Sequence, residues 1–164
     1  MLPPLWTQQP APPVSGERWS CDLTSVAQLS QVRHQLRELL PTLGHRPDVT
    51  PVAVDQLVLA FDELASNALR HGQPPVRARI TTTPTCWLLD VSDTATSRPP
   101  AEDTNRDLAA GGMGLYLIAA FATDHGWFLA RGRKHVWASI PFTPEDPPEP
   151  VLPGQRVRRA AALD

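Results

Sequence analysis

Nineteen prolines divide this chain of 164 residues into three parts. Five of them fall within residues 1–16 and six within residues 141–164, so both ends are much richer in proline than the middle. Proline has no backbone N–H to donate and is poorly tolerated inside helices and sheets. We therefore expect Pro-rich flexible tails at residues 1–16 and 143–164. Residues 17–142 remain as the folded part, which is the usual size of one domain.

The charge and cysteine content of the chain exclude several classes of function. Its 15 basic and 17 acidic residues give a net charge of -2, and the basic residues are dispersed, which argues against direct binding of nucleic acid or a membrane surface. The only cysteines, Cys21 and Cys86, lack the spacing of a zinc site or a disulfide framework. Neither a signal peptide nor an apolar run of about 18 residues is visible. These features predict a cytoplasmic protein.

Hydrophobic periodicity predicts the secondary structure of the folded part. The expected strands are residues 17–23, 76–82, 86–92, 126–130 and 135–142, and the expected helices are residues 26–40, 50–71 and 112–122. Helices that are segregated from a mainly antiparallel sheet form a two-layer α/β sandwich of the α+β class, in which the helices cover one face of the sheet. Residues 93–112 lack periodicity, and a loop of about 20 residues is long enough to be a lid.

The segment FDELASNALRHG carries Glu63 and Asn67 four residues apart in the helix expected at residues 50–71. Residues at this spacing lie one turn apart on the same side of a helix. One interpretation is that both belong to the solvent-exposed face of an amphipathic helix. The other is that a carboxylate and a carboxamide point toward one Mg²⁺ ion, which prefers oxygen ligands and usually takes only one or two from the protein.

Two further features are compatible with a bound nucleotide. Gly111, Gly112 and Gly114 stand before or at the start of a predicted helix, where free backbone N–H groups can bind phosphate, although they could equally end a mobile loop. Asp93 directly follows the strand expected at residues 86–92. It is either an ordinary turn residue or a buried acceptor for the amino group of adenine.

The order of these features resembles the Bergerat-type ATP-binding fold of the GHKL superfamily, which contains DNA gyrase and the bacterial histidine kinases. The shared pattern is Glu-x-x-x-Asn on a helix, Asp after the next strand pair, and Gly-Gly-Met-Gly-Leu opening a later helix. The short chain favours the RsbW-like anti-sigma-factor kinases within that superfamily. The resemblance covers nearly all of residues 17–142 and includes the closing segment HVWASIPF.

The resemblance implies a function and a set of site residues. The reaction would be transfer of the γ-phosphoryl group of ATP, with Mg²⁺, to a Ser or Thr of a STAS-type antagonist. A homodimer that also sequesters a sigma factor is expected. Glu63 would be the general base, Asn67 the metal ligand, and Asp93 the acceptor for adenine. The nucleotide-binding residues that it implies are Asn67, Asp93, Ala95, Gly112, Met113, Gly114 and Leu115.

The sequence departs from the pattern of the superfamily at two places, both on the adenine side. The motif Asp-x-Gly-x-Gly is represented by residues 93–97 with Ala95 and Ser97 in place of the glycines. A Thr that supports the adenine-binding Asp at the start of the last strand is expected to be replaced by His135. Both departures therefore affect the adenine site and leave the proposed metal site unchanged.

Two other functions are compatible with the sequence. The first is a non-catalytic module that binds a partner protein and keeps a degenerate nucleotide pocket, as the lost glycines suggest. The second is a detached catalytic domain of a histidine kinase with His34 as phosphoacceptor, although a single helix is not the helical hairpin that such a kinase requires.

Overall fold

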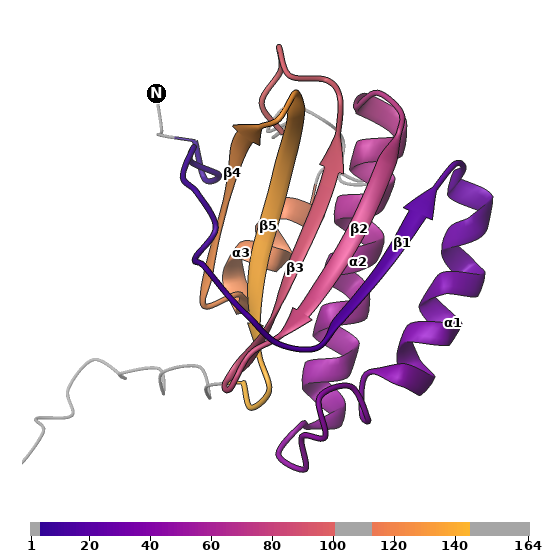
Figure 1. Cartoon of the computed structure of the whole chain (residues 1–164), viewed down its shortest axis with the longest axis vertical. Coiled ribbons are helices and arrows are strands. Elements are labelled where there is room, and N and C mark those ends of the chain that lie inside the picture. The colour runs from indigo at the N-terminus through magenta and orange to yellow at the C-terminus, as the bar shows by residue number, and fades with distance from the viewer. Residues whose placement is uncertain (1–3, 101–112, 145–164) are drawn as a thin grey trace, which may run out of the picture.

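The computed structural model describes residues 4–100 and 113–144, which form a five-stranded sheet and helices packed against it (Figure 1). In chain order the elements are β1 (Arg18–Leu23), a short 3-10 helix η1 (Val26–Gln28), α1 (Leu29–Leu39), α2 (Pro51–His71), β2 (Val76–Thr82), β3 (Cys86–Asp93), α3 (Gly114–Phe121), β4 (Asp124–Ala130) and β5 (Arg133–Pro141). The strand order is β1-β2-β3-β5-β4, and all neighbours are antiparallel. All three α-helices lie on one face of the sheet, which confirms the predicted α+β sandwich.

The helix α2 has both of the ends that its sequence predicts. The Thr50 hydroxyl accepts a hydrogen bond from the backbone N–H of Ala53 at 3.1 Å, and Pro51 occupies the first turn, where its missing N–H costs nothing. Gly72 ends the helix and donates its N–H to the carbonyl of Ala68 at 2.9 Å. Because both ends are fixed, the polar residues of α2 have a defined position against the sheet.

The helix-facing side of the sheet ends in two charged residues. On β3 the side chains of Trp87, Leu89 and Val91 join the hydrophobic core, as do Val136, Ala138 and Ile140 on β5. Side chains of a strand alternate between its two faces, so the next helix-facing positions at this end of the strands are Asp93 and Lys134. These two residues are opposite each other in the register of β3 and β5. The core rows therefore continue directly into a polar site.

The flexible tail expected for residues 1–16 is wrong for the part that the structure describes. Trp6 is 3% exposed, and its indole N–H donates to the carbonyl of Leu115 on α3 at 3.1 Å. Gln8 forms a parallel bridge to Trp127 on the outer edge of β4, with Gln9 N donating to the carbonyl of Trp127 at 2.9 Å. In Figure 1 this segment runs beside β4 and then across the sheet to β1.

The predicted C-terminal tail and the predicted lid loop fall largely outside the described part of the chain. Most of the C-terminal tail, residues 145–164, and residues 101–112 of the loop lie outside the described residues. Within residues 4–100 and 113–144, no helix combines the length and the apolar character needed to cross a membrane.

Candidate functional site

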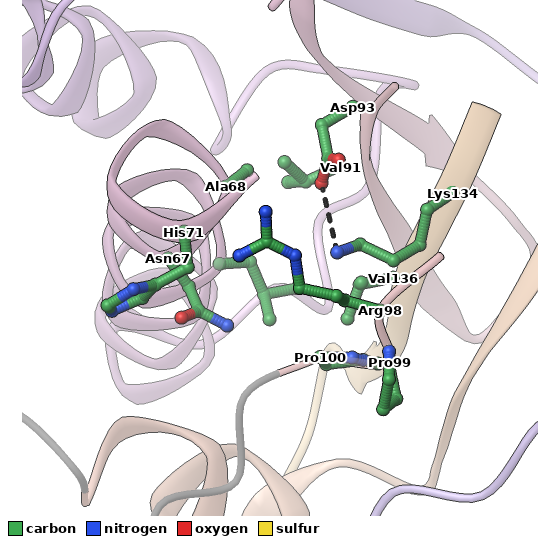
Figure 2. A pocket seen from close by; sticks show the side chains of 11 residues that line it. Asn67, Ala68, His71, Val91, Asp93, Arg98, Pro99, Pro100, Lys134 and Val136 are labelled. Atoms are coloured by element: carbon green, nitrogen blue, oxygen red, sulfur yellow. Dashed lines mark ion pairs between the residues drawn. The ribbon is translucent and has the colours of Figure 1, made fainter. Parts of the chain in front are cut away.

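A cavity of about 120 Å³ lies between α2 and the adjoining ends of β3 and β5. Its lining comes from α2, from the two strands and from the segment 98–100: Leu64, Asn67, Ala68, His71, Val91, Asp93, Arg98, Pro99, Pro100, Lys134 and Val136. Figure 2 shows the side chain of Arg98 extending between Asn67 on the helix and the Asp93–Lys134 pair on the sheet. The cavity thus combines apolar walls with a few convergent polar groups, as small-molecule sites commonly do.

Asp93 is the one acidic residue among the described residues that line the cavity, and 1% of its surface is exposed. One carboxylate oxygen, Oδ1, accepts hydrogen bonds from the backbone N–H groups of Ala95 at 2.7 Å and Gln73 at 3.4 Å. The other, Oδ2, lies 3.5 Å from the Nζ atom of Lys134. A Cβ atom at Gly72 would lie only 2.6 Å from Oδ2, so glycine at the end of α2 leaves the space that Asp93 occupies. The carboxylate is therefore held in one orientation.

Lys134, and not His135, stands beside Asp93. The expectation that His135 replaces the supporting Thr of the superfamily is wrong by one residue, and because strand side chains alternate, this places His135 on the opposite face of the sheet. There, its Nδ1 lies 2.9 Å from a carboxylate oxygen of Asp90, and its ring stacks on Phe128 with 4.6 Å between centroids. Lys134 is 5% exposed and points into the cavity.

Glu63 lies one turn before Asn67 on α2, against the start of α3. A Cβ atom built on Gly114 would overlap Oε2 of Glu63, so the missing side chain of Gly114 makes room for this carboxylate. Burial raises the pKa of Glu63 above its ordinary value, the negative charge of Asp62 raises it further, and Arg70 lowers it. A half-buried carboxylate with a raised pKa holds a proton more readily than an exposed one, which suits a general base.

The residues predicted for the site are distributed over three places. Asn67 and Asp93 line the same cavity, and Ala95 contributes its backbone N–H to Asp93. Gly114 and Leu115 form the first turn of α3, which Met113 precedes with an exposed side chain. Gly112 lies outside the described residues. The structure therefore brings two of the predicted site residues, Asn67 and Asp93, into the lining of a single cavity.

Sequence reasoning assigned no site role to Lys134 or Arg98, both of which line the cavity. For Lys134 a signal was present, because Lys134, Val136 and Ala138 alternate along one strand and the last two are typical core residues. The last strand was expected to begin at residue 135, whereas β5 begins at Arg133, so Lys134 was left out of the strand and its alternation was missed. Arg98 lies in a segment without periodicity, so only the tertiary structure could bring it to the cavity.

The domain is thus an α+β sandwich in which a buried carboxylate and a helical carboxamide line one pocket. The family model described as the histidine kinase-like ATPase domain matches residues 24–140, well over half of the chain, and the chain belongs to that family within the GHKL superfamily. An ATP-binding regulatory function follows from this membership. No curated protein matches the sequence.

Proposed function

We propose that the protein is an anti-sigma-factor kinase of the RsbW-like group, which uses Mg-ATP to phosphorylate a Ser or Thr of a STAS-type antagonist. In the same proposal it acts as a homodimer and sequesters a sigma factor when the antagonist is phosphorylated. The partners are inferred from the resemblance of the sequence to that group.

The observation that carries the proposal is the placement of Glu63 and Asn67 on successive turns of α2. Asn67 lines the same cavity as Asp93, and Glu63 lies against Gly114, the first residue of α3. The proposed general base and the proposed metal ligand therefore lie on one helix. They stand between the end of the cavity where adenine would bind and the start of α3, which would receive the phosphates. Rigid placement of this kind is what phosphoryl transfer requires, because most of its catalysis is positioning and charge neutralisation.

The residues of the site have distinct roles in the proposed reaction. The hydroxyl oxygen of the antagonist attacks the γ-phosphorus of ATP, the bond to the β,γ-bridging oxygen breaks, and ADP leaves. Glu63 accepts the proton of the hydroxyl. Free backbone N–H groups at the start of α3, around Gly114, would bind phosphate oxygens. Mg²⁺ would neutralise phosphate charge when it is bound, and Asn67 is the residue that would hold it, with water and phosphate oxygens completing its ligands.

A phosphoryl-transfer assay with Glu63→Gln tests this proposal. The protein is incubated with Mg-ATP labelled at the γ-phosphate and with candidate STAS antagonists, and phosphorylated antagonist is measured. We expect transfer by the wild type, and a loss of transfer in Glu63→Gln with ATP binding retained. Glu38→Gln, at an exposed position of α1, is the matched control. Equal transfer by Glu63→Gln and wild type would reject the role of Glu63.

One observation favours the second candidate function, a non-catalytic partner-binding module with a degenerate nucleotide pocket. The carboxylate that would bind adenine already has a buried cation beside it, since Oδ2 of Asp93 lies 3.5 Å from Nζ of Lys134. Calorimetric titration of ATP separates the two candidates. Tight Mg²⁺-dependent binding that requires Asn67 supports the kinase, whereas a folded protein that does not bind ATP supports the module.

A further inference from the structure

Lys134 is a buried cation that the proposed phosphoryl transfer does not use. It is the only lysine of the chain, it is 5% exposed, and its ammonium group lines the cavity. A buried ammonium group is costly unless it has partners. Asp93 is a partner, but the separation of 3.5 Å is long for a charge-assisted hydrogen bond, which is usually about 2.7–2.9 Å. The ammonium group has three N–H donors, so it retains donor capacity toward the cavity.

The carboxylate of Asp93 has one oxygen left for a ligand. Oδ1 already accepts two backbone N–H groups, from Ala95 and Gln73. Oδ2 faces Lys134. The end of the cavity therefore offers a ligand one acceptor, Oδ2, next to one donor, the ammonium group of Lys134.

This arrangement matches the edge of adenine better than that of guanine. Adenine carries the N6 amino donor beside the N1 acceptor, so it needs one acceptor and one donor side by side. Guanine carries the O6 acceptor beside two donors, N1–H and the N2 amino group, and it would need two free acceptors. One of the guanine donors would then be buried without a partner, which is unfavourable.

We propose that Lys134 is a specificity-determining residue that donates a hydrogen bond to N1 of adenine while Oδ2 of Asp93 accepts from the N6 amino group. This inference rests on the ATP site of the proposed function and deepens it. In this proposal the ion pair orients the ammonium group of Lys134 beside the carboxylate of Asp93. In the opposite role, which we call the plug, the ion pair with Lys134 blocks Asp93 and competes with the binding of adenine.

The test combines a change in the protein with a change of one atom in the ligand. Affinities of ATP and of 1-deaza-ATP, in which a C–H group replaces N1, are measured by calorimetry with wild type and with Lys134→Met. We expect the wild type to bind 1-deaza-ATP roughly 10- to 100-fold more weakly than ATP, as expected for loss of one hydrogen bond to a charged group. Lys134→Met should bind both ligands equally, with about the affinity of wild type for 1-deaza-ATP.

Two controls keep the result interpretable. His135→Ala changes the neighbouring residue on the opposite face of β5 and should retain the full preference for ATP over 1-deaza-ATP. If Lys134→Met does not fold, the double variant Asp93→Asn with Lys134→Met removes both buried charges and should show no preference between the two ligands. The wild-type comparison of the two ligands needs no variant at all.

Different outcomes reject different claims. Equal binding of ATP and 1-deaza-ATP by the wild type, or tighter binding of ATP by Lys134→Met, would overturn the role of Lys134 as a donor, and tighter binding would establish the plug. Neither result would affect the phosphoryl-transfer assay, which tests Glu63. Absence of ATP binding in folded wild type and folded Lys134→Met alike would overturn both this inference and the proposed kinase.

Discussion

The helix side and the sheet side of the cavity differ in how deeply their polar residues are buried. On the helix side, Asn67 lines the cavity and Glu63 precedes it by one turn on α2, and both side chains are partly buried. On the sheet side, Asp93 and Lys134 are almost fully buried and carry opposite charges. Partly exposed groups can exchange water for phosphate or metal at little cost, whereas buried charges must be compensated before a ligand arrives. In the proposed function, this difference in burial assigns the reaction to the helix side and the selective binding of adenine to the sheet side.

The largest expected effect concerns the helix side alone. Glu63→Gln removes the proton acceptor, so we expect the rate of phosphoryl transfer to fall by roughly 10²- to 10⁴-fold, the usual contribution of general base catalysis. ATP affinity should stay within about twofold of wild type, because in the proposal adenine is bound by Asp93 and Lys134 on the sheet side. Single-turnover transfer and calorimetry measure the two quantities. A parallel loss of ATP affinity would show that the two sides are not separable.

The next effect concerns the stability of the sheet side. Lys134→Met leaves the buried carboxylate of Asp93 without its cation, and breaking a buried pair typically lowers the free energy of unfolding by about 3–5 kcal/mol. The double variant Asp93→Asn with Lys134→Met should recover most of this loss. Urea unfolding measures both, and Arg79→Met, which removes an exposed positive charge from β2, is the control. A loss at Arg79 as large as that at Lys134 would remove the distinction between buried and exposed charge.

A smaller effect is expected when the metal ligand is removed. Asn67→Ala should weaken ATP binding roughly tenfold in the presence of Mg²⁺, comparable to the loss of one ligand or one of its supporting contacts. It should have little effect without Mg²⁺, because the sheet side is unchanged. Titrations with and without Mg²⁺ measure this difference, with Gln35→Ala in α1 as the control. The assignment of Asn67 to the metal fails when both titrations weaken equally.

The smallest effect concerns the pH dependence of stability. The pKa of Glu63 is raised above its ordinary value of 4.5 by burial, so ionisation of Glu63 is less favourable in the folded than in the unfolded protein. The wild type therefore loses stability relative to Glu63→Gln as pH rises from 4.5 through the folded pKa, and the two coincide below 4.5. At pH 7 we expect a difference of a few tenths of a kcal/mol, because water screens a half-exposed group.

Thermal unfolding between pH 3.5 and 7 measures this difference, and Glu38→Gln is the exposed control. A variant Glu63→Gln that is less stable than wild type at pH 7 would show that the carboxylate makes a stabilising contact, contrary to the effect of burial.

The parts of the molecule that could be predicted from the sequence depend on local signals. The helix α2 was predicted with both ends, because Thr50, Pro51 and Gly72 each act within one turn of the helix. Its periodicity also placed Glu63 and Asn67 on the same side. The strands β2 and β3 follow from the alternation of apolar residues, and the order of all helices and strands along the chain was sufficient to predict the fold class.

The parts that could not be predicted depend on tertiary contacts. The choice between Lys134 and His135 as partner of Asp93 depends on strand register, and a shift of one residue exchanges the two faces of the sheet. The packing of residues 5–9 depends on the free edge of β4, which lies more than a hundred residues later in the chain. Trp6 within the proline-rich segment was the available signal, since a large aromatic side chain is rarely left in solvent.

The bridge between Gln8 and Trp127 also limits how the protein can assemble. A sheet with two open edges can add strands at both ends and grow into a fibre. Here the N-terminal segment covers part of the outer edge of β4, so among the described residues β1 is the edge strand left open along its length. Pairing of two copies about a two-fold axis would use the open edge of β1, and the pair would then present only the partly covered edges of β4 to further strands.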